Sequence, residues 1–329
     1  MILSRKLETV TGNLFYRFFH TAVQIAFKSD NRFSAVLEWI ASDNKRFADL
    51  LEHILGNDLY FIKLLEHAIK NDRRLAFMLN YFIESDHSYQ KLMSLIRDTE
   101  VGTQNERQRE EWLARTLSTI PAGSRLLDAG AGESQYKRFC DHLDYVSQDF
   151  AQYDGSGDTS GLQVGQWNQN ALDIVSDITA IPEPDGAFDA IMCIEVLEHV
   201  PDPILAIKEL SRLLRKGGTL IITAPFCSLT HFAPYHVVAG FNRYFYYAHL
   251  PALGFNVREV TPNGNYFDYL AQELRRLHYV SERYAHDAPD RREQLAIKVL
   301  LSMMDRLTKK NIRSEELLNF GYLVVAQKA

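Results

Sequence analysis

The stretch Leu126-Leu127-Asp128-Ala129-Gly130-Ala131-Gly132 decides the fold of this chain. Its apolar residues predict a buried strand, and the two glycines predict a tight turn that leads into a helix. Because glycine has no Cβ, the backbone of such a turn can approach a ligand closely at a helix N-terminus. The stretch therefore predicts a strand, turn and helix unit with a ligand at the turn.

Further apolar runs continue the strand pattern. They stand at 145–147, 174–176, 188–194, 219–224, 257–260 and 322–326, with helical patterns between most of them. Strands that alternate with helices predict an α/β fold with a doubly wound, mostly parallel sheet of seven strands. In such a sheet the ligand sits at the carboxyl ends of the strands.

Three residues near the turn indicate the kind of ligand. Another strand ends at Asp149, whose carboxylate can accept both hydrogen bonds of a ribose diol. The dinucleotide fingerprint requires a third glycine where this chain has Gln135, and an aspartate at position 128 would repel a pyrophosphate. S-adenosylmethionine is cationic at its sulfonium and ammonium groups and needs no phosphate cradle. These residues therefore favour it over a nicotinamide dinucleotide.

Several motifs, in order, resemble the class I S-adenosylmethionine-dependent methyltransferases. They are the stretch 126–132, Asp149, Asp177-Ile178, the segments 188–191 and 194–202, and the turn 214–218. The resemblance covers about 123–261 and the last strand, and it implies a Rossmann-like fold, S-adenosylmethionine as cofactor and methyl transfer as the reaction. It assigns cofactor binding to Asp128, Ala129, Gly130, Ala131, Gly132, Asp149, Phe150, Asp177, Ile178 and Cys193. The segment 262–319 departs from the family pattern, and its apolar stripe from Leu295 to Leu307 predicts a helical insertion.

The candidate catalytic residues follow the fourth and fifth strands, and they are Glu195, His199, His231 and His236. Glu195 and Glu198 stand three residues apart with His199 adjacent, which is an oxygen-rich set that suits Mg²⁺ or Mn²⁺, and His236 can complete it. Some ubiquinone-pathway and small-RNA 2′-O-methyltransferases are similar here and bind a divalent metal. Many other relatives have the same residues at a helix terminus or in side-chain packing, without a metal. A metal site and a structural role therefore both stay open.

The segment after the fifth strand bears on the acceptor. Pro225-Phe226, His231, Pro234-Tyr235, Arg243 and Gly254-Phe255 follow an order similar to methyltransferases of bacterial surface-glycan and nucleotide-sugar pathways. This branch implies O-methylation of a sugar, a nucleotide sugar or a related hydroxylated small molecule. In the alternative interpretation, the aromatic residues 244–246 only cover the cofactor pocket.

The first third of the chain carries a 14-residue repeat over about 30–96. Short polar residues recur at Asp30, Asn44, Asp58, Asp72 and Asp86, and apolar residues follow each one at offsets three, six, seven and ten. This pattern predicts five short helices, each with an N-terminal cap. Because 14 residues also equal two heptad repeats, the alternative structure is a continuous coiled coil. We therefore expect a helical domain at 1–98, a linker at 99–109 and a methyltransferase domain at 110–329. The helices must bury their stripes on their own chain, a second copy or a protein partner.

Composition limits the function classes further. Hydrophobic residues make up 46% and charged residues 24%, which is typical of a globular protein, and the net charge of −6 gives no signal for a nucleic-acid partner. The three cysteines, Cys140, Cys193 and Cys227, form neither a disulfide framework nor a CxxC pair, which favours a reducing cytoplasm. No apolar stretch is long enough to predict a transmembrane helix.

Two other functions compete with methyl transfer. One is a scaffold that keeps the cofactor fold without turnover and works through its helical repeats, and the intact Asp128, Gly130, Gly132 and Asp149 weigh against it. The other is a nicotinamide-dependent oxidoreductase, which Gln135 disfavours.

Overall fold

A computed structural model describes residues 86–169 and 171–329 of the chain. The chain divides into two compact units, 1–88 and 89–329. Four of the five predicted repeat helices lie outside the described residues. The fifth coincides with α6 (Asp86–Leu95), which begins at its predicted cap residue.

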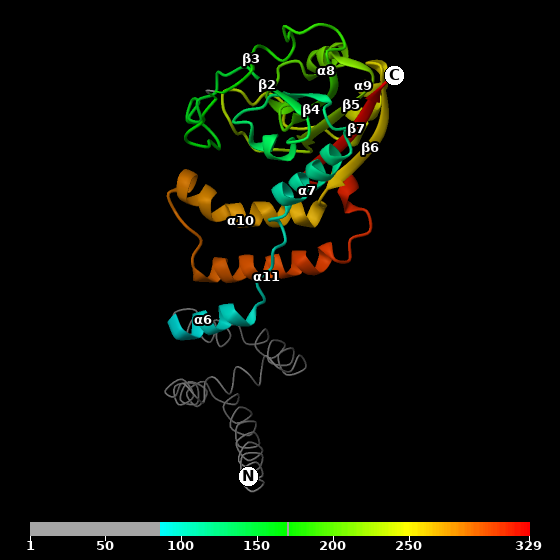
Figure 1. Ribbon diagram of the computed structural model, residues 1–329. Coiled ribbons are helices and arrows are strands. Elements are labelled where there is room, and N and C mark those ends of the chain that lie inside the picture. The colour runs from blue at the N-terminus through cyan, green and yellow to red at the C-terminus, as the bar shows by residue number, and fades with distance from the viewer. Residues whose placement is uncertain (1–85, 170) are drawn as a thin grey trace, which may run out of the picture. The chain divides into compact units, whose positions relative to one another are not determined.

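A seven-stranded mixed sheet forms the centre of the larger unit, as predicted (Figure 1). Its order is β3-β2-β1-β4-β5-β7-β6, and β7 runs antiparallel to both of its neighbours. The strands are β1 (Arg125–Ala129), β2 (Asp144–Asp149), β3 (Ile174–Val175), β4 (Phe188–Ile194), β5 (Leu214–Pro225), β6 (Phe255–Asn263) and β7 (Gly321–Lys328). All seven predicted runs fall on these strands, with ends that differ by a few residues.

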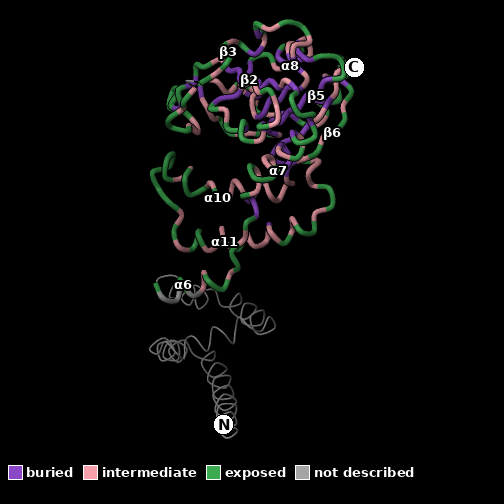
Figure 2. The backbone as a smooth tube through the Cα atoms, in the orientation of Figure 1, coloured by how far each residue is buried: buried purple, intermediate pink, exposed green. Residues whose placement is uncertain are grey.

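Helices cover both faces of the sheet. They are α7 (Asn105–Ser118), α8 (Pro203–Leu213), α9 (Arg243–Ala252), α10 (Tyr266–Ala285) and α11 (Arg291–Thr308), with short 3₁₀ helices η1 (Gln135–Phe139), η2 (Leu197–His199) and η3 (Ser314–Glu316). Side chains alternate along a strand, so Leu127 packs with α8 and α9 on one face while Leu126 packs with α7 on the other. The buried residues accordingly concentrate in and around the sheet, as Figure 2 shows.

The helix predicted after the glycine-rich turn is reduced to the short 3₁₀ helix η1, so that expectation was wrong. Ser134 has a φ of +58°, and Gly132 has a φ of +53°. Left-handed residues at these positions interrupt the right-handed helical backbone, so the chain leaves the turn without a long helix.

The segment expected to be a linker, 99–109, packs closely against the domain. A Cβ at Gly102 would lie 2.4 Å from the backbone nitrogen of Gln272 in α10, and α7 already begins at Asn105. The segment between β6 and β7 contains α10, α11 and η3, and Ala271 and Met304 of these helices share a small core with Val101. In the described ranges, no helix is long and apolar enough to cross a bilayer.

Candidate functional site

The glycine-rich turn connects β1 to η1 at the carboxyl end of the sheet. Gly130 has a φ of +81°, and a Cβ there would meet Val196 Cγ2 at 2.5 Å. A Cβ at Gly132 would meet Trp167 Cζ2 at 2.7 Å. The backbone N–H groups of Gly130 and Ala131 both donate to the carbonyl of Gln148, at 2.8 Å each. Glycine is therefore required at both positions by backbone conformation and by close neighbours.

Asp149 closes the same edge of the sheet. Its carboxylate accepts hydrogen bonds from Gly132 N at 2.9 Å, from Ala151 N at 3.0 Å and from Gln169 Nε2 at 2.9 Å. Three of the roughly four acceptor sites of this carboxylate are thus used within the protein, which fixes its position against the turn and leaves about one site for a ligand.

Asp128 occupies a different place. It is buried, and Tyr145 Oη donates to its Oδ2 at 2.6 Å. Burial raises the pKa of Asp128 to about 7. Ala129 and Cys193 are likewise fully buried in their strands, and none of these three predicted cofactor residues lines the pocket.

A pocket of about 870 Å³ opens beside the turn. Seven of the predicted cofactor residues line it, namely Gly130, Ala131, Gly132, Asp149, Phe150, Asp177 and Ile178. The candidate catalytic residues Glu195, His199 and His231 line the same pocket. The volume falls in the range usual for small-molecule and cofactor sites.

Glu195 is held by a residue that the motifs do not reveal. It follows β4 with a φ of +55°, and Arg109 Nη1 of α7 lies 3.3 Å from its Oε2. Arg109 also lines the pocket. The residue lies in a polar helix far from every motif in the sequence, and no spacing signal could have identified it.

Glu198, His199 and His231 form a compact cluster, in which one ligand atom from each lies within 4.8 Å of the others. The Nδ1 atoms of His199 and His231 lie 2.9 Å and 2.8 Å from the carbonyls of Tyr235 and Leu229. A carbonyl only accepts, so each Nδ1 carries the proton and each neutral Nε2 keeps a lone pair.

The two lone pairs converge on one carboxyl group. His199 Nε2 lies 3.8 Å from Glu198 Oε1, and His231 Nε2 lies 3.9 Å from the same atom. Glu198 is almost fully buried, its Oε2 has no hydrogen-bond partner, and burial raises the pKa of its carboxyl well above the usual value. Burial also lowers the pKa of His199 to about 3.

The predicted metal set is therefore only partly assembled. Glu198 and His199 come together as expected, but His231 takes the place expected for His236. His236 Nε2 instead lies 3.0 Å from Ser228 Oγ, and Glu195 pairs with Arg109.

The chain matches a family model described as a methyltransferase domain over residues 101–296. It is 31% identical over 169 residues to a demethylmenaquinone methyltransferase of Beutenbergia cavernae, which covers 50% of this chain and 64% of the relative. It is 49% identical over 49 residues to a ubiquinone biosynthesis O-methyltransferase of Xanthomonas campestris pv. campestris, which covers 15% and 20%. The chain thus spans less than two thirds of these relatives. A solved methyltransferase from Archaeoglobus fulgidus has 17% identity and a TM-score of 0.41, and the match covers 67% of this chain and 92% of that one.

Proposed function

The chain belongs to the class I S-adenosylmethionine-dependent methyltransferase family, and from this premise we propose that it methylates a hydroxyl group of a small molecule. The observation that carries the proposal is the shared pocket. The glycine-rich turn and Asp149 line this pocket, and so do His199 and His231.

The residues of the turn fit the expected cofactor. Gly130, Ala131 and Gly132 all line the pocket, so the turn borders the space that the cofactor would occupy. Asp149 keeps about one acceptor site for a ribose hydroxyl, and Asp177 and Ile178, which line the pocket, are the proposed contacts of the adenine ring. Asp128 supports this edge from within the sheet through its bond to Tyr145 and makes no contact with the pocket.

The reaction requires alignment and the removal of one proton. When bound, the cofactor supplies an electrophilic methyl group that an acceptor oxygen attacks in line. His231 Nε2 carries the lone pair that takes the hydroxyl proton, since its Nδ1 donates to the carbonyl of Leu229. Glu195 is paired with Arg109, so we assign the removal of the proton to His231 and not to Glu195.

The acceptor proposal rests on the lining of the pocket. Histidine and aromatic side chains beside carboxylates suit a hydroxylated compound, and the sequence order after β5 favours a sugar or nucleotide sugar. The two relatives carry names from quinone biosynthesis, so hydroxylated aromatic compounds belong in the same screen.

A divalent cation at Glu198, His199 and His231 is a second proposal for the same cluster. Each histidine donates a hydrogen bond from its Nδ1–H to a carbonyl, which is the usual support of a metal-bound imidazole, and Glu198 Oε2 has no hydrogen-bond partner in the described residues. Two nitrogen ligands favour Mn²⁺ or Zn²⁺ over Mg²⁺. Such an ion would polarise the acceptor oxygen as a Lewis acid.

Calorimetry with S-adenosylhomocysteine tests the cofactor assignment. We expect micromolar binding in the wild type and much weaker binding in Asp149→Ala, whose circular dichroism should stay unchanged. Wild-type protein that does not bind would contradict the proposal and favour the scaffold alternative.

Metal titration separates the two roles of the cluster. If a cation is bound, calorimetry with Mn²⁺ or Zn²⁺ shows a site that Glu198→Gln and His199→Gln both remove. If His231 acts only as a base, His231→Gln abolishes turnover, chelators have no effect on the wild type and no metal isotherm appears.

The arrangement of the whole chain also remains a proposal. We propose a helical domain at 1–98 that binds a partner or a second copy, and a methyltransferase domain at 110–329. The segment 99–109, expected as a linker, packs on α10 and therefore belongs with the methyltransferase domain. Light scattering of the full chain, and of the chain with Leu37→Asp and Leu51→Asp, tests this arrangement. Association that the two substitutions abolish supports it, and association that they leave unchanged contradicts it.

A further inference from the structure

Two loops form one continuous wall of the pocket. They are the β2–β3 loop (150–173) and the β5–α9 loop (226–242). Leu162 N donates to Thr230 O at 3.0 Å, Phe232 N donates to Leu162 O at 2.9 Å, and Asp158 N donates to Ala233 O at 3.0 Å. Backbone pairing fixes the loops to each other, so the side chains they present to the pocket act as a single surface.

Aromatic rings make up most of this wall. Phe150 and Tyr235 meet edge to face at 5.0 Å between ring centres, and Tyr153 stacks on Phe232 at 4.7 Å. Trp167 meets Phe232 at 5.4 Å. All five rings line the pocket. Each of these three contacts joins one loop to the other, so the rings form one apolar surface.

The wall reaches the proposed base. Leu162 and His231 pair as an isolated bridge, and the ring of His199 stacks on Phe232 at 5.2 Å. A group that lies against the rings is therefore next to the imidazoles of His199 and His231.

Two valines extend the apolar lining to the surface. Val164 is 49% exposed and Val237 is 51% exposed, although both line the pocket. Val237 is held in place by its N–H, which donates to the carbonyl of Glu198 at 3.0 Å. Because both valines line the pocket, a ligand that extends along the aromatic wall toward the surface would cover them.

We propose that this wall binds an apolar portion of the acceptor, so that the acceptor is amphipathic, with an apolar ring or chain next to the hydroxyl group that is methylated. The inference rests on the proposed methyl transfer and narrows its substrate class. Alkylated phenols and alkyl glycosides both combine a hydroxyl group with an apolar chain. The test below distinguishes these two classes of acceptor.

Two matched pairs of compounds test the inference. 4-Hexylresorcinol is compared with resorcinol, and octyl β-glucoside with methyl β-glucoside, each below its micelle-forming concentration. Binding is measured by calorimetry on full-length protein saturated with S-adenosylhomocysteine. We expect the tailed member of at least one pair to bind about tenfold tighter or more, because burial of two methylene groups is enough for about that factor. The pair in which the tailed compound binds more tightly identifies the class of the acceptor.

Three half-exposed valines supply the variants and their control. Val164→Asp and Val237→Asp should remove the gain from the tail, and the milder Val164→Thr and Val237→Thr should reduce it. Val299→Asp on α11 changes a residue of equal exposure, 50%, that does not line the pocket, so it should keep the gain.

The outcomes separate this inference from the proposed function. Failure of every protein to bind S-adenosylhomocysteine contradicts the methyltransferase proposal itself. Normal S-adenosylhomocysteine binding with no gain from either tail overturns the inference. A gain that survives Val164→Asp and Val237→Asp also overturns it, because the tail then binds elsewhere.

Discussion

The burial of Asp128 has a consequence for stability that depends on pH. Its pKa is raised to about 7, so between about pH 4 and pH 7 the folded state holds a proton that the unfolded state releases. The free energy of unfolding contributed by this group therefore falls as pH rises through that window. Asp128→Asn keeps an acceptor for Tyr145 Oη and should flatten the dependence in urea titrations from pH 4 to 8. The exposed Asp144→Asn serves as control, and an unchanged slope in Asp128→Asn would show that Asp128 is not the source.

Alanine substitutions at two glycines distinguish the cost of backbone strain from the cost of steric crowding. Gly123 and Gly130 both have left-handed φ, +78° and +81°, but a Cβ at Gly123 meets nothing within 4 Å while one at Gly130 meets Val196 Cγ2 at 2.5 Å. Gly123→Ala should lower the free energy of unfolding by about 1–2 kcal/mol. Gly130→Ala should add about 1–3 kcal/mol of crowding and weaken S-adenosylhomocysteine binding. Equal losses in the two variants, measured by chemical denaturation, would contradict this account.

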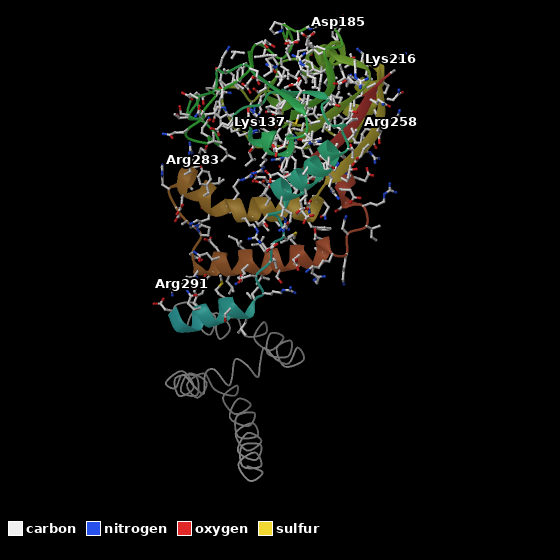
Figure 3. All side chains as sticks on the ribbon, viewed as in Figure 1. Lys137, Asp185, Lys216, Arg258, Arg283 and Arg291 are labelled. Atoms are coloured by element: carbon white, nitrogen blue, oxygen red, sulfur yellow. The ribbon has the colours of Figure 1, made fainter. Side chains whose placement is uncertain are left out.

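At the scale of the elements, α10 braces the β2–β3 loop. Arg283, labelled in Figure 3 at the end of α10, donates through Nη2 to the carbonyl of Thr159 at 2.9 Å. Tyr284 Oη donates to Gly161 O at 3.4 Å. Arg283→Ala should speed amide hydrogen exchange in 156–163 while global stability changes by less than about 0.5 kcal/mol. Arg258→Ala on β6, which removes a bond to Gln327, should leave exchange in that loop unchanged.

The elements also show what the sequence can and cannot predict. The seven strands and the glycine-rich turn carry local signals, because alternation and paired glycines act over a few residues. The shortness of η1 depends on the left-handed backbone conformation of Ser134, which nothing in the amino-acid sequence requires. Arg109 and the aromatic wall reach the pocket through contacts between distant segments, such as the pairing of Leu162 with Thr230. His231 rather than His236 joins Glu198 for the same reason, since the fold of one loop decides which ring arrives.

For the whole molecule, ligand binding should raise the stability of the unit at 89–329. A ligand at one hundred times its dissociation constant stabilises the folded state by about 2.7 kcal/mol, which corresponds to about 5–10 °C for a unit of this size. Differential scanning fluorimetry with S-adenosylhomocysteine measures the shift, and Asp149→Ala should abolish it. An equal shift with adenosine triphosphate would indicate a different ligand class.

The antiparallel strand β7 lies between β5 and β6, although it is the last in sequence of the seven strands in the described part of the chain. During translation β6 therefore leaves the ribosome before the only strand with which it pairs in the described sheet. The helices α10 and α11 emerge in the interval, and the nascent chain must keep β6 from pairing with other polypeptides until 321–328 has been synthesised. Folding of this half of the sheet is thus delayed until β7 has been synthesised, whereas β1, β2 and β4 can pair before that point.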